Sequence, residues 1–247
     1  MDAKVVVVTG GARGIGRATA LRFSEEGYIP VILDRDAEAG AAAASLLEAK
    51  RVEGRFIQAD LTDKAEVAAA FERILSACGR IDILVNLAGG TFHKGAIQDV
   101  TPAQWKECVD LNLKTTFLCS QAAIAPMKQA GRGVIVNTAS NFGVTGGAER
   151  THYAAAKAAI IAFSKSLATE LAPHGIRVNT IAPGLTGTDR VRGKYDADEW
   201  AKLSGGLPMG RAATPEEIAD GIFFLATDES DYVTGATLHV NGGMVMP

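Results

Sequence analysis

The chain has 247 residues, of which 47% are hydrophobic and 21% are charged, and its formal net charge is −3. A chain of this length and composition can bury a core in one or at most two globular domains without disulfides or a metal. It contains no lysine- or arginine-rich run, which argues against nucleic acid and anionic membranes as partners.

At the N-terminus, Met1-Asp2-Ala3-Lys4 leads directly into a run of four valines. That run is too short for the apolar core of a signal peptide, and no stretch of the sequence approaches the roughly 20 apolar residues of a membrane span. The three cysteines form no C-x-x-C pair, which favours reduced thiols, and the four histidines lack metal-ligand spacing. We therefore expect a cytoplasmic protein without a metal site.

Short apolar runs alternate with longer amphipathic segments along the chain, and this pattern predicts strands alternating with helices. In chain order we expect a strand at Val5–Thr9, a helix at Gly14–Glu26, a strand at Ile29–Leu33, a helix at Ala37–Lys50, a strand at Arg55–Gln58, a helix at Lys64–Cys78, a strand at Ile81–Asn86, a long helix at Pro102–Ala130, a strand at Val134–Asn137, a helix at Thr151–Leu171, a strand at Arg177–Ile181, a helix at Thr214–Leu225 and a strand at Thr237–Val240.

Continuous Val/Ile/Leu strands separated by helices predict an α/β fold with a parallel sheet that is covered on both faces. Right-handed crossovers then make the sheet doubly wound, in a single domain over residues 1–247. In such a sheet, ligands bind beyond the carboxyl ends of the strands. One irregular stretch, Gly184–Gly210, is too polar for core and long for a connector, so we expect it to form a lid over the substrate.

The first strand runs into Thr9-Gly10-Gly11-Ala12-Arg13-Gly14-Ile15-Gly16, which opens the first helix. Glycines let the backbone turn tightly and approach a pyrophosphate, while the helix N-terminus offers free N–H groups and partial positive charge. A glycine-rich loop alone also fits a plain tight turn. Its position between a strand and a helix favours a dinucleotide site.

Asp34 follows the second strand, where a carboxylate can accept hydrogen bonds from the adenosine ribose hydroxyls and would repel a 2′-phosphate. This predicts NAD as the cofactor, with NADP less favoured. Arg13 and Arg35 argue the other way, because either could pair with a phosphate. Asp34 could alternatively cap the next helix. Asp60, after the third strand, fits either a contact to the adenine edge or a cap for the helix that follows.

Tyr153 and Lys157 stand four residues apart in an expected helix, so both side chains share one face. A nearby ammonium favours the phenolate, which lowers the pKa of the tyrosine and lets it exchange a proton with an alcohol or ketone. A surface pair is the alternative, but the small apolar residues around them favour packed helix.

Ser140 follows the fifth strand and could hold the substrate oxygen. Asn112, inside an apolar helix, could hold a water near Lys157.

These residues occur together, and over essentially its whole length the chain resembles a short-chain dehydrogenase/reductase. The matching pieces are Thr9-Gly10-x-x-x-Gly14-x-Gly16, Asp60-Leu61, Asn86-Leu87-Ala88-Gly89, Asn112, Ser140, Tyr153-x-x-x-Lys157, Arg177-Val178-Asn179 and Pro183-Gly184. The resemblance implies a Rossmann-type fold, a homotetramer, which helices around Phe117 and Phe163 would permit, and a catalytic tetrad of Asn112, Ser140, Tyr153 and Lys157. It also implies cofactor contacts from Gly10, Arg13, Gly14, Ile15, Gly16, Asp34, Arg35, Asp60, Leu61, Asn86, Ala88, Gly89, Tyr153, Lys157, Pro183, Gly184, Thr186 and Thr188.

Three positions depart from the family pattern: Leu87 replaces an asparagine, Thr186 a branched apolar residue, and Asn241 an aspartate. None belongs to the tetrad, so the resemblance still implies activity. In similar proteins the backbone at the position of Thr186 meets the nicotinamide carboxamide, a contact that the replacement should preserve.

The substrate is a small molecule expected under the lid, with walls from Phe92, His93, Asn141, Phe142, Glu149 and Arg190. Arg190, Arg192 and Lys194 could attract a carboxylate or phosphate, or form a solvated charge run. We expect a hydride to pass between NAD(H) and a secondary alcohol or ketone. The alternatives are an NADPH-dependent 3-oxoacyl-(acyl-carrier-protein) reductase, against which Asp34 counts, and a non-catalytic dinucleotide-binding protein.

Overall fold

A seven-stranded parallel sheet forms the centre of the protein, in a computed structural model that describes residues 3–49 and 54–247. The strand order is β3-β2-β1-β4-β5-β6-β7, so the winding direction reverses between β1 and β4, as in a doubly wound fold. The strands are β1 (Val5–Thr9), β2 (Ile29–Asp34), β3 (Arg55–Gln58), β4 (Ile83–Asn86), β5 (Gly133–Thr138), β6 (Ile176–Pro183) and β7 (Thr237–Val240). The predicted α/β, Rossmann-type doubly wound sheet is confirmed.

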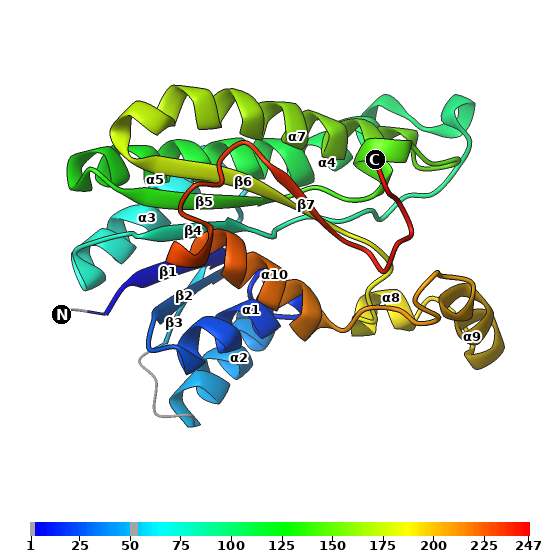
Figure 1. The fold of residues 1–247 in the computed structure, drawn as a ribbon, viewed down its shortest axis with the longest axis horizontal. Helices are drawn as coiled ribbons and strands as arrows, with labels where there is room; N and C mark the ends of the chain where they lie inside the picture. The colour runs from blue at the N-terminus through cyan, green and yellow to red at the C-terminus, as the bar shows by residue number, and fades with distance from the viewer. Residues whose placement is uncertain (1–2, 50–53) are drawn as a thin grey trace.

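Helices cover both faces of this sheet (Figure 1). One layer holds α1 (Gly14–Glu25), α2 (Ala37–Ala49) and α10 (Pro215–Ala226), and the other holds α3 (Lys64–Cys78), α4 (Pro102–Val109), α5 (Thr115–Ala130) and α7 (Thr151–Leu171). The shorter helices are η1 (Ile97–Asp99), the π-turn η2 (Asp110–Lys114), α6 (Phe142–Thr145), η3 (Ala172–His174), α8 (Asp189–Arg192), α9 (Ala197–Gly205) and η4 (Asp228–Ser230).

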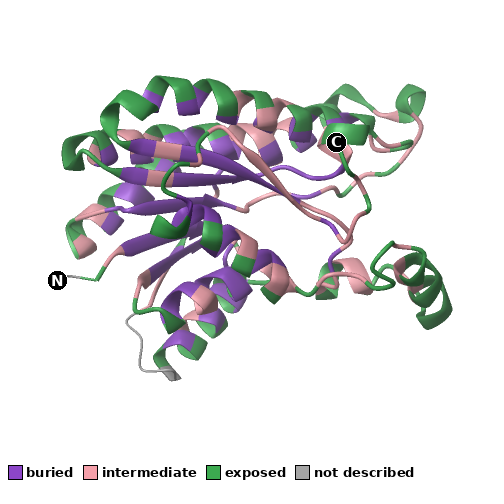
Figure 2. Ribbon diagram, in the orientation of Figure 1, coloured by how far each residue is buried: buried purple, intermediate pink, exposed green. Residues whose placement is uncertain are grey.

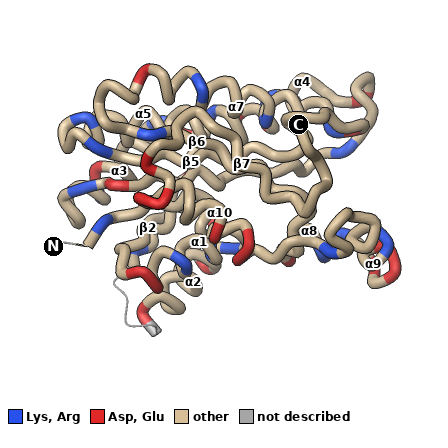
Figure 3. The backbone as a smooth tube through the Cα atoms, in the orientation of Figure 1, with Lys and Arg blue, Asp and Glu red and all other residues tan. Residues whose placement is uncertain are grey.

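The valine run of β1 explains how one strand serves both layers. Val5 and Val7 belong to the core beneath α3, α5 and α7, whereas Val6 and Val8 belong to the core beneath α1, α2 and α10. Successive side chains of a strand point to opposite faces, so a strand buried on both sides has no polar alternation. Figure 2 shows the central strands as buried, and Figure 3 shows that charged residues lie mainly on helices and loops.

Most predicted elements occur within one or two residues of their expected bounds, and two differ in kind. The long helix expected over Pro102–Ala130 is interrupted by the π-turn η2, which adds a residue to one turn and redirects the side chains there. The stretch expected to be irregular contains α8 and α9, and Asp196 caps α9 with a capping box. Lys50, expected to end the second helix, lies outside the described residues.

The α8–α9 segment projects from the body at the end toward which the strands point (Figure 1). This position at the carboxyl edge is where the fold expects ligands. Across residues 3–49 and 54–247, no helix combines the length and apolar character needed to span a membrane, and no cluster of three or more metal-ligating side chains occurs.

Candidate active site

Several of the predicted site residues come from loops that leave the carboxyl ends of β1, β4, β5 and β6. These strands are neighbours, and the parallel register brings Thr9 beside Asn86, Asn86 beside Asn137, and Thr138 beside Ile181. The loops that follow are therefore adjacent at one edge of the sheet.

The glycine loop after β1 has no room for side chains at two of its positions. A Cβ added to Gly16 would lie 2.1 Å from the carbonyl oxygen of Gly10, and one added to Gly10 would lie 2.9 Å from the Cα of Ala88. Gly10 also has a φ of 64°, in the left-handed region that favours glycine. The loop therefore packs backbone against backbone, and its surface is bare main chain.

The N-terminus of α1 lacks the side-chain cap that other helices of the protein have. Asp63, Thr101 and Thr214 cap α3, α4 and α10, but Arg13 at the N-cap of α1 gives no such hydrogen bond. The first-turn N–H groups and the positive end of the helix dipole remain available to an anion. This uncapped end, beside a bare glycine loop, fits the pyrophosphate of a dinucleotide.

Asp34 at the end of β2 is held by two backbone N–H groups. Its carboxylate accepts hydrogen bonds from Ala12 at 3.2 Å and from Asp36 at 3.1 Å. The alternative that Asp34 caps α2 is wrong, because Asp36 accepts from the N–H of Ala39 at 3.0 Å. The Asp34 carboxylate is thus fixed beside the glycine loop, and each of its oxygens can accept a further hydrogen bond.

Arg13 is engaged by a carboxylate that the sequence analysis did not single out. Its guanidinium donates to Asp36 at 3.0 and 3.3 Å. The backbone N–H of Ala39 and the charge of Arg13 together hold the pKa of Asp36 below its usual range. Because Arg13 is already paired with Asp36, it is less available to bind a phosphate than the sequence alone suggested.

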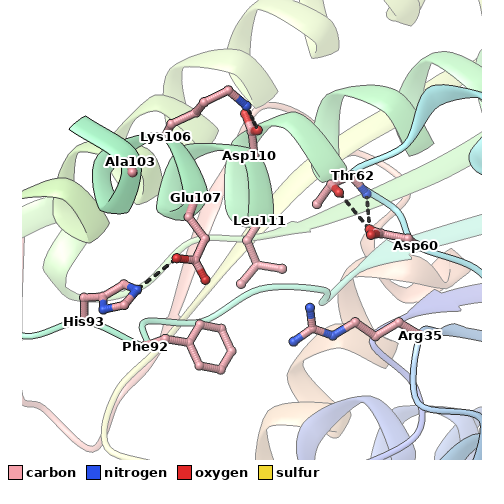
Figure 4. A pocket seen from close by; sticks show the side chains of 10 residues that line it. All are labelled: Arg35, Asp60, Thr62, Phe92, His93, Ala103, Lys106, Glu107, Asp110 and Leu111. Atoms are coloured by element: carbon pink, nitrogen blue, oxygen red, sulfur yellow. Dashed lines mark hydrogen bonds and ion pairs between the residues drawn. The ribbon is translucent and has the colours of Figure 1, made fainter. Parts of the chain in front are cut away.

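A cavity of about 540 Å³ opens between the ends of β2 and β3 and the helix α4 (Figure 4). Arg35, Asp60 and Thr62 line one end of the cavity, and the Arg35 side chain points into it. Phe92 and Glu107 line the other end. Asp60 does not cap α3, since its carboxylate accepts from the N–H and hydroxyl of Thr62 at 2.9 and 2.8 Å. These two bonds lower the pKa of Asp60. The cavity lies where the adenine half of a dinucleotide is expected.

The loop after β4 is attached to β1 by Thr9. The Thr9 hydroxyl accepts from the N–H groups of Leu87 and Ala88 at 3.0 and 3.1 Å. Leu87, which replaces the family's asparagine, packs against the apolar core. The Asn86 amide nitrogen donates inward to Ser120 and Asn137, and among the described residues its buried Oδ1 has no hydrogen-bond partner, so the predicted cofactor contact of Asn86 stays a prediction.

Asn112 is completely buried in the π-turn and its amide is fully engaged. It accepts from the N–H of Gly90 at 3.0 Å and donates to the carbonyls of Gly90 and Cys108 at 2.9 and 2.8 Å. An asparagine inside an apolar helix therefore finds its partners in the loop after β4. In this structure the side chain anchors that loop, and its expected role in a water relay stays a prediction.

Ser140, Tyr153 and Lys157 come together at the start of α7. The Ser140 hydroxyl lies close enough to the Tyr153 phenol to act on its pKa. Lys157 is buried, donates to the carbonyl of Thr138 at 2.8 Å, and has its Nζ 5.7 Å from the centroid of the Tyr153 ring. The two residues share one helix face, and the surface-pair alternative is wrong because Lys157 is only 4% exposed.

Burial raises the pKa of Tyr153, while the Ser140 hydroxyl and the charges of Arg190 and Arg150 act against this rise. Burial also lowers the pKa of Lys157 to about 7. The expectation that Lys157 makes the phenol acidic therefore does not hold for the protein alone. Its ammonium donates to a backbone carbonyl, and burial of both groups outweighs their interaction.

The expected substrate walls divide into two groups. Phe142 lies beside Tyr153, with ring centroids 6.4 Å apart, and Arg190 donates to the carbonyl of Gly89 at 3.2 Å. Phe92 lies against Arg190, whose guanidinium carbon is 5.7 Å from its ring centroid, and the other three contact different partners. His93 faces the large cavity and bonds Glu107 at 2.9 Å, Glu149 pairs with Lys94 at 2.8 Å, and the Asn141 side chain accepts from Asn241 at 3.2 Å.

The segment after β6 closes on the glycine loop. A Cβ on Gly14 would lie 3.1 Å from the Cγ2 of Thr188, so Thr188 packs directly on that loop. Its hydroxyl caps α8. Thr186 is buried and pairs with Ala213, and Gly184 donates to the carbonyl of Val240 at 3.0 Å. Thr188 therefore lies against the dinucleotide loop, and the cofactor contacts expected of Pro183, Gly184, Thr186 and Thr188 stay predictions.

Sequence reasoning missed three residues that shape this site: Thr9, Asp36 and Cys108. Thr9 directly precedes the first glycine, a position from which a hydroxyl can reach the next strand's loop. Asp36 follows Asp34 at a helix start, which is a recognisable cap position. Cys108 is buried near Lys157, whose charge acts to lower the pKa of the thiol that burial raises. No sequence signal predicts that approach.

Known proteins resemble this chain over nearly its full length. A family model described as enoyl-(acyl carrier protein) reductase matches residues 10–245. The chain is 41% identical over 246 residues to the 3-oxoacyl-(acyl-carrier-protein) reductase FabG of Vibrio harveyi, covering 100% of this chain and 99% of the relative. It is 40% identical to the FabG of Escherichia coli strain K12, covering 99% and 98%. The crystal structure of gox2181 matches with a TM-score of 0.93 at 34% identity, covering 99% of this chain and 96% of that one.

Proposed function

This chain belongs to the short-chain dehydrogenase/reductase family, and we propose that it transfers a hydride between NAD(H) and the 3-oxo group of a 3-oxoacyl compound. The observation that carries the reaction type is the cluster of Ser140, Tyr153 and buried Lys157 beside an uncapped, glycine-lined helix end. A bound nicotinamide supplies or accepts the hydride. The residues of this chain hold and move the proton.

The substrate class follows from the relatives, whose names favour the 3-oxoacyl alternative over an unspecified secondary alcohol. The bacterial relatives at about 40% identity match over essentially their whole length, and each is a 3-oxoacyl-(acyl-carrier-protein) reductase. A 3-oxo group is itself a ketone that becomes a secondary alcohol on reduction. The expected interconversion of a secondary alcohol and a ketone is therefore the general form of the 3-oxoacyl reaction proposed here.

The preference for NAD rests on the charges around the second strand. Asp34 is fixed by two N–H groups beside the glycine loop, where it would repel a 2′-phosphate. Arg13, which could offset that repulsion, is paired with Asp36. Arg35 remains, but it faces the cavity beside Asp60. The carboxylates outweigh the cations at this position, so we favour NADH over NADPH.

Each residue of the tetrad has a distinct task. Tyr153 donates its proton to the carbonyl oxygen during reduction and takes it back during oxidation. Ser140, close to the phenol, would orient that substrate oxygen. Lys157 would hold the cofactor ribose and, while charged, favours the phenolate. Asn112 secures Gly90 in the loop after β4, which would border the cofactor.

The test measures loss of NADH or NADPH absorbance with acetoacetyl-CoA as the substrate. We expect turnover with NADH and a kcat/KM at least about tenfold lower with NADPH, since each 1.4 kcal/mol of repulsion corresponds to a tenfold change. A preference for NADPH would refute the role of Asp34. Absence of turnover with either cofactor would refute the 3-oxoacyl assignment.

A second candidate keeps the same residues and NAD but oxidises a small secondary alcohol. The polar surroundings of Tyr153, with Arg150 and Arg190 acting on its pKa, favour it. NADH production with hydroxy acids, sugars or cyclic diols, but not with 3-hydroxybutyryl-CoA, would select this candidate. If none is turned over while dinucleotide still binds, the protein is a non-catalytic dinucleotide-binding protein.

We also propose a homotetramer and a lid formed by Gly184–Gly210. Phe117 on α5 is 42% exposed and Trp105 on α4 is also exposed, which leaves apolar surface for another subunit. Phe163, expected to take part, packs instead against the core. Light scattering of the purified protein gives the oligomeric state directly.

A further inference from the structure

Three cations from two segments gather near Tyr153, and the reaction described above uses none of them. Arg190 lies in α8, Lys194 follows α8, and Arg150 precedes α7. The guanidinium of Arg190 lies 5.7 Å from the Phe92 ring centroid, and that of Arg150 lies 5.3 Å from the Phe142 ring centroid. Phe142 in turn packs edge-on against Tyr153. The charges therefore border the space in front of the phenol.

The position of Arg190 is fixed by the loop that Asn112 anchors. Its Nη1 donates to the carbonyl of Gly89 at 3.2 Å, and a Cβ added to Gly90 would lie only 2.5 Å from that same nitrogen. Gly90 also has a φ of 146°, which side chains rarely adopt. The guanidinium thus lies flat on a bare glycine, and among the described residues Gly89 is the one hydrogen-bond partner of Arg190.

No carboxylate forms an ion pair with any of these three cations within residues 3–49 and 54–247, although the charge of Arg150 acts on Glu149. The acids nearby are engaged by other partners, Glu149 by Lys94 at 2.8 Å and Glu107 by His93 at 2.9 Å. Asp189, beside Arg190 in sequence, forms no ion pair in the same part of the chain. By contrast, Arg13, Arg22 and Arg211 all have acidic partners.

The mutual effect of these charges is consistent with one shared region. Burial and then the charges of Arg190 and Arg150 lower the pKa of Lys194. The charge of Arg190 likewise acts to lower the pKa values of Tyr153 and Lys157. A positive field whose three cations have no ion-pair partner in the described part of the chain favours a ligand that brings a negative charge.

We propose that Arg190, assisted by Arg150 and Lys194, forms an anion subsite beside Tyr153 and selects substrates that carry a carboxylate or phosphate. This deepens the proposed function and rests on it for the reaction. The anion has two possible sources: the carboxylate of a free 3-oxo acid, or a phosphate on the carrier of a thioester. A guanidinium pairs with either through two parallel N–H bonds.

Three substrates with the same 3-oxobutyryl group separate these sources. Acetoacetate carries a carboxylate, acetoacetyl-CoA carries phosphates, and the N-acetylcysteamine thioester of acetoacetate carries no charge. The variant is Arg190→Gln. The matched control is Arg192→Gln in the same helix, because Arg192 donates to the carbonyl of Tyr195 at 3.0 Å and stacks on Trp200 at 5.2 Å, away from Tyr153.

We expect Arg190→Gln to lower the ratio of kcat/KM for one charged substrate to that for the neutral thioester by about tenfold or more, the usual effect of losing a hydrogen bond to a charged group. The charged substrate affected identifies the source of the anion. Arg192→Gln should leave both ratios unchanged. An Arg190→Gln effect equal for all three substrates, or below about twofold in both ratios, overturns the proposal.

A binding measurement keeps this result apart from the proposed reaction. The non-productive complex with NAD⁺ is titrated with acetoacetate and with acetoacetamide, its neutral amide, while protein fluorescence is recorded. We expect the acid to bind about tenfold more tightly, and Arg190→Gln to remove that preference. Equal affinities in the unmodified protein overturn the subsite. If the preference is present but no 3-oxoacyl compound is reduced, the proposed function fails and the subsite stands.

Discussion

Replacement of Lys157 by methionine tests whether a buried ammonium limits the stability of this protein. Burial lowers the pKa of Lys157 from 10.5 to about 7, and the residue is only 4% exposed. Because one pKa unit corresponds to 1.36 kcal/mol, this shift is equivalent to about 5 kcal/mol between the two protonation states. Methionine keeps the apolar stem and removes the charge.

The sign of the pH dependence follows from the protons bound in each state. Below pH 7 Lys157 is protonated in both the folded and the unfolded chain, so the full cost of burying the charge is present. As the pH rises toward 10.5, the folded protein has lost the proton that the unfolded chain still binds. Stability therefore rises by about 1.4 kcal/mol per pH unit in this window.

The assay is urea unfolding at fixed protein concentration for the natural protein and Lys157→Met. From about pH 7 to about pH 9, we expect the natural protein to gain about 2 kcal/mol relative to the variant. The lost hydrogen bond to Thr138, at 2.8 Å, shifts the variant by a constant amount and leaves this slope unaffected. The control is Lys165→Met, an exposed lysine on the same helix. Parallel curves for Lys157→Met and the natural protein would refute the reasoning.

The remaining predictions concern the proton, the cofactor and the loop after β4. Tyr153→Phe should lower kcat by about 100-fold to 10,000-fold while NADH affinity, measured by fluorescence, stays nearly intact; persisting turnover would exclude Tyr153 as the acid. Asp36→Asn, which can still cap α2, should free Arg13 and raise kcat/KM with NADPH about tenfold, the usual effect of a charge-assisted bond, with NADH kinetics as the control. Asn112→Ala should lower the free energy of unfolding by about 2–4 kcal/mol, since three buried backbone groups lose their partner; an unchanged urea midpoint would contradict that anchoring role.

The sheet could be predicted from sequence because both of its faces are buried. A strand such as β1, whose valines enter two cores, is apolar throughout and stands out against the amphipathic helices. The helices α8 and α9 were missed for the opposite reason. They are short, lie among glycines and charges, and are exposed over much of their length, so no apolar stripe marks them.

The identities of the site residues were predictable, but their contacts were not. A tyrosine and a lysine one helical turn apart must share a face, and the structure has them so. The partner of the lysine depends on the end of β5, where the carbonyl of Thr138 accepts a hydrogen bond from its ammonium. Likewise Asn112 reaches Gly90 only because a π-turn redirects it, and Asp36 takes Arg13 through a contact between separate segments.

The electrostatics of the site connect the charge of the substrate to the proton on Lys157. In the protein alone, burial and then the charge of Arg190 lower the pKa of that lysine, so close to neutral pH it holds its proton only part of the time. An anion paired with Arg190 cancels the second of these effects and favours the ammonium. The ammonium is the form that stabilises a phenolate on Tyr153 when an alcohol gives up its proton. A charged substrate would thus favour the Lys157 ammonium that burial disfavours, and so the phenolate of Tyr153. The negative charge that Arg190 recognises would then also assist the proton transfer.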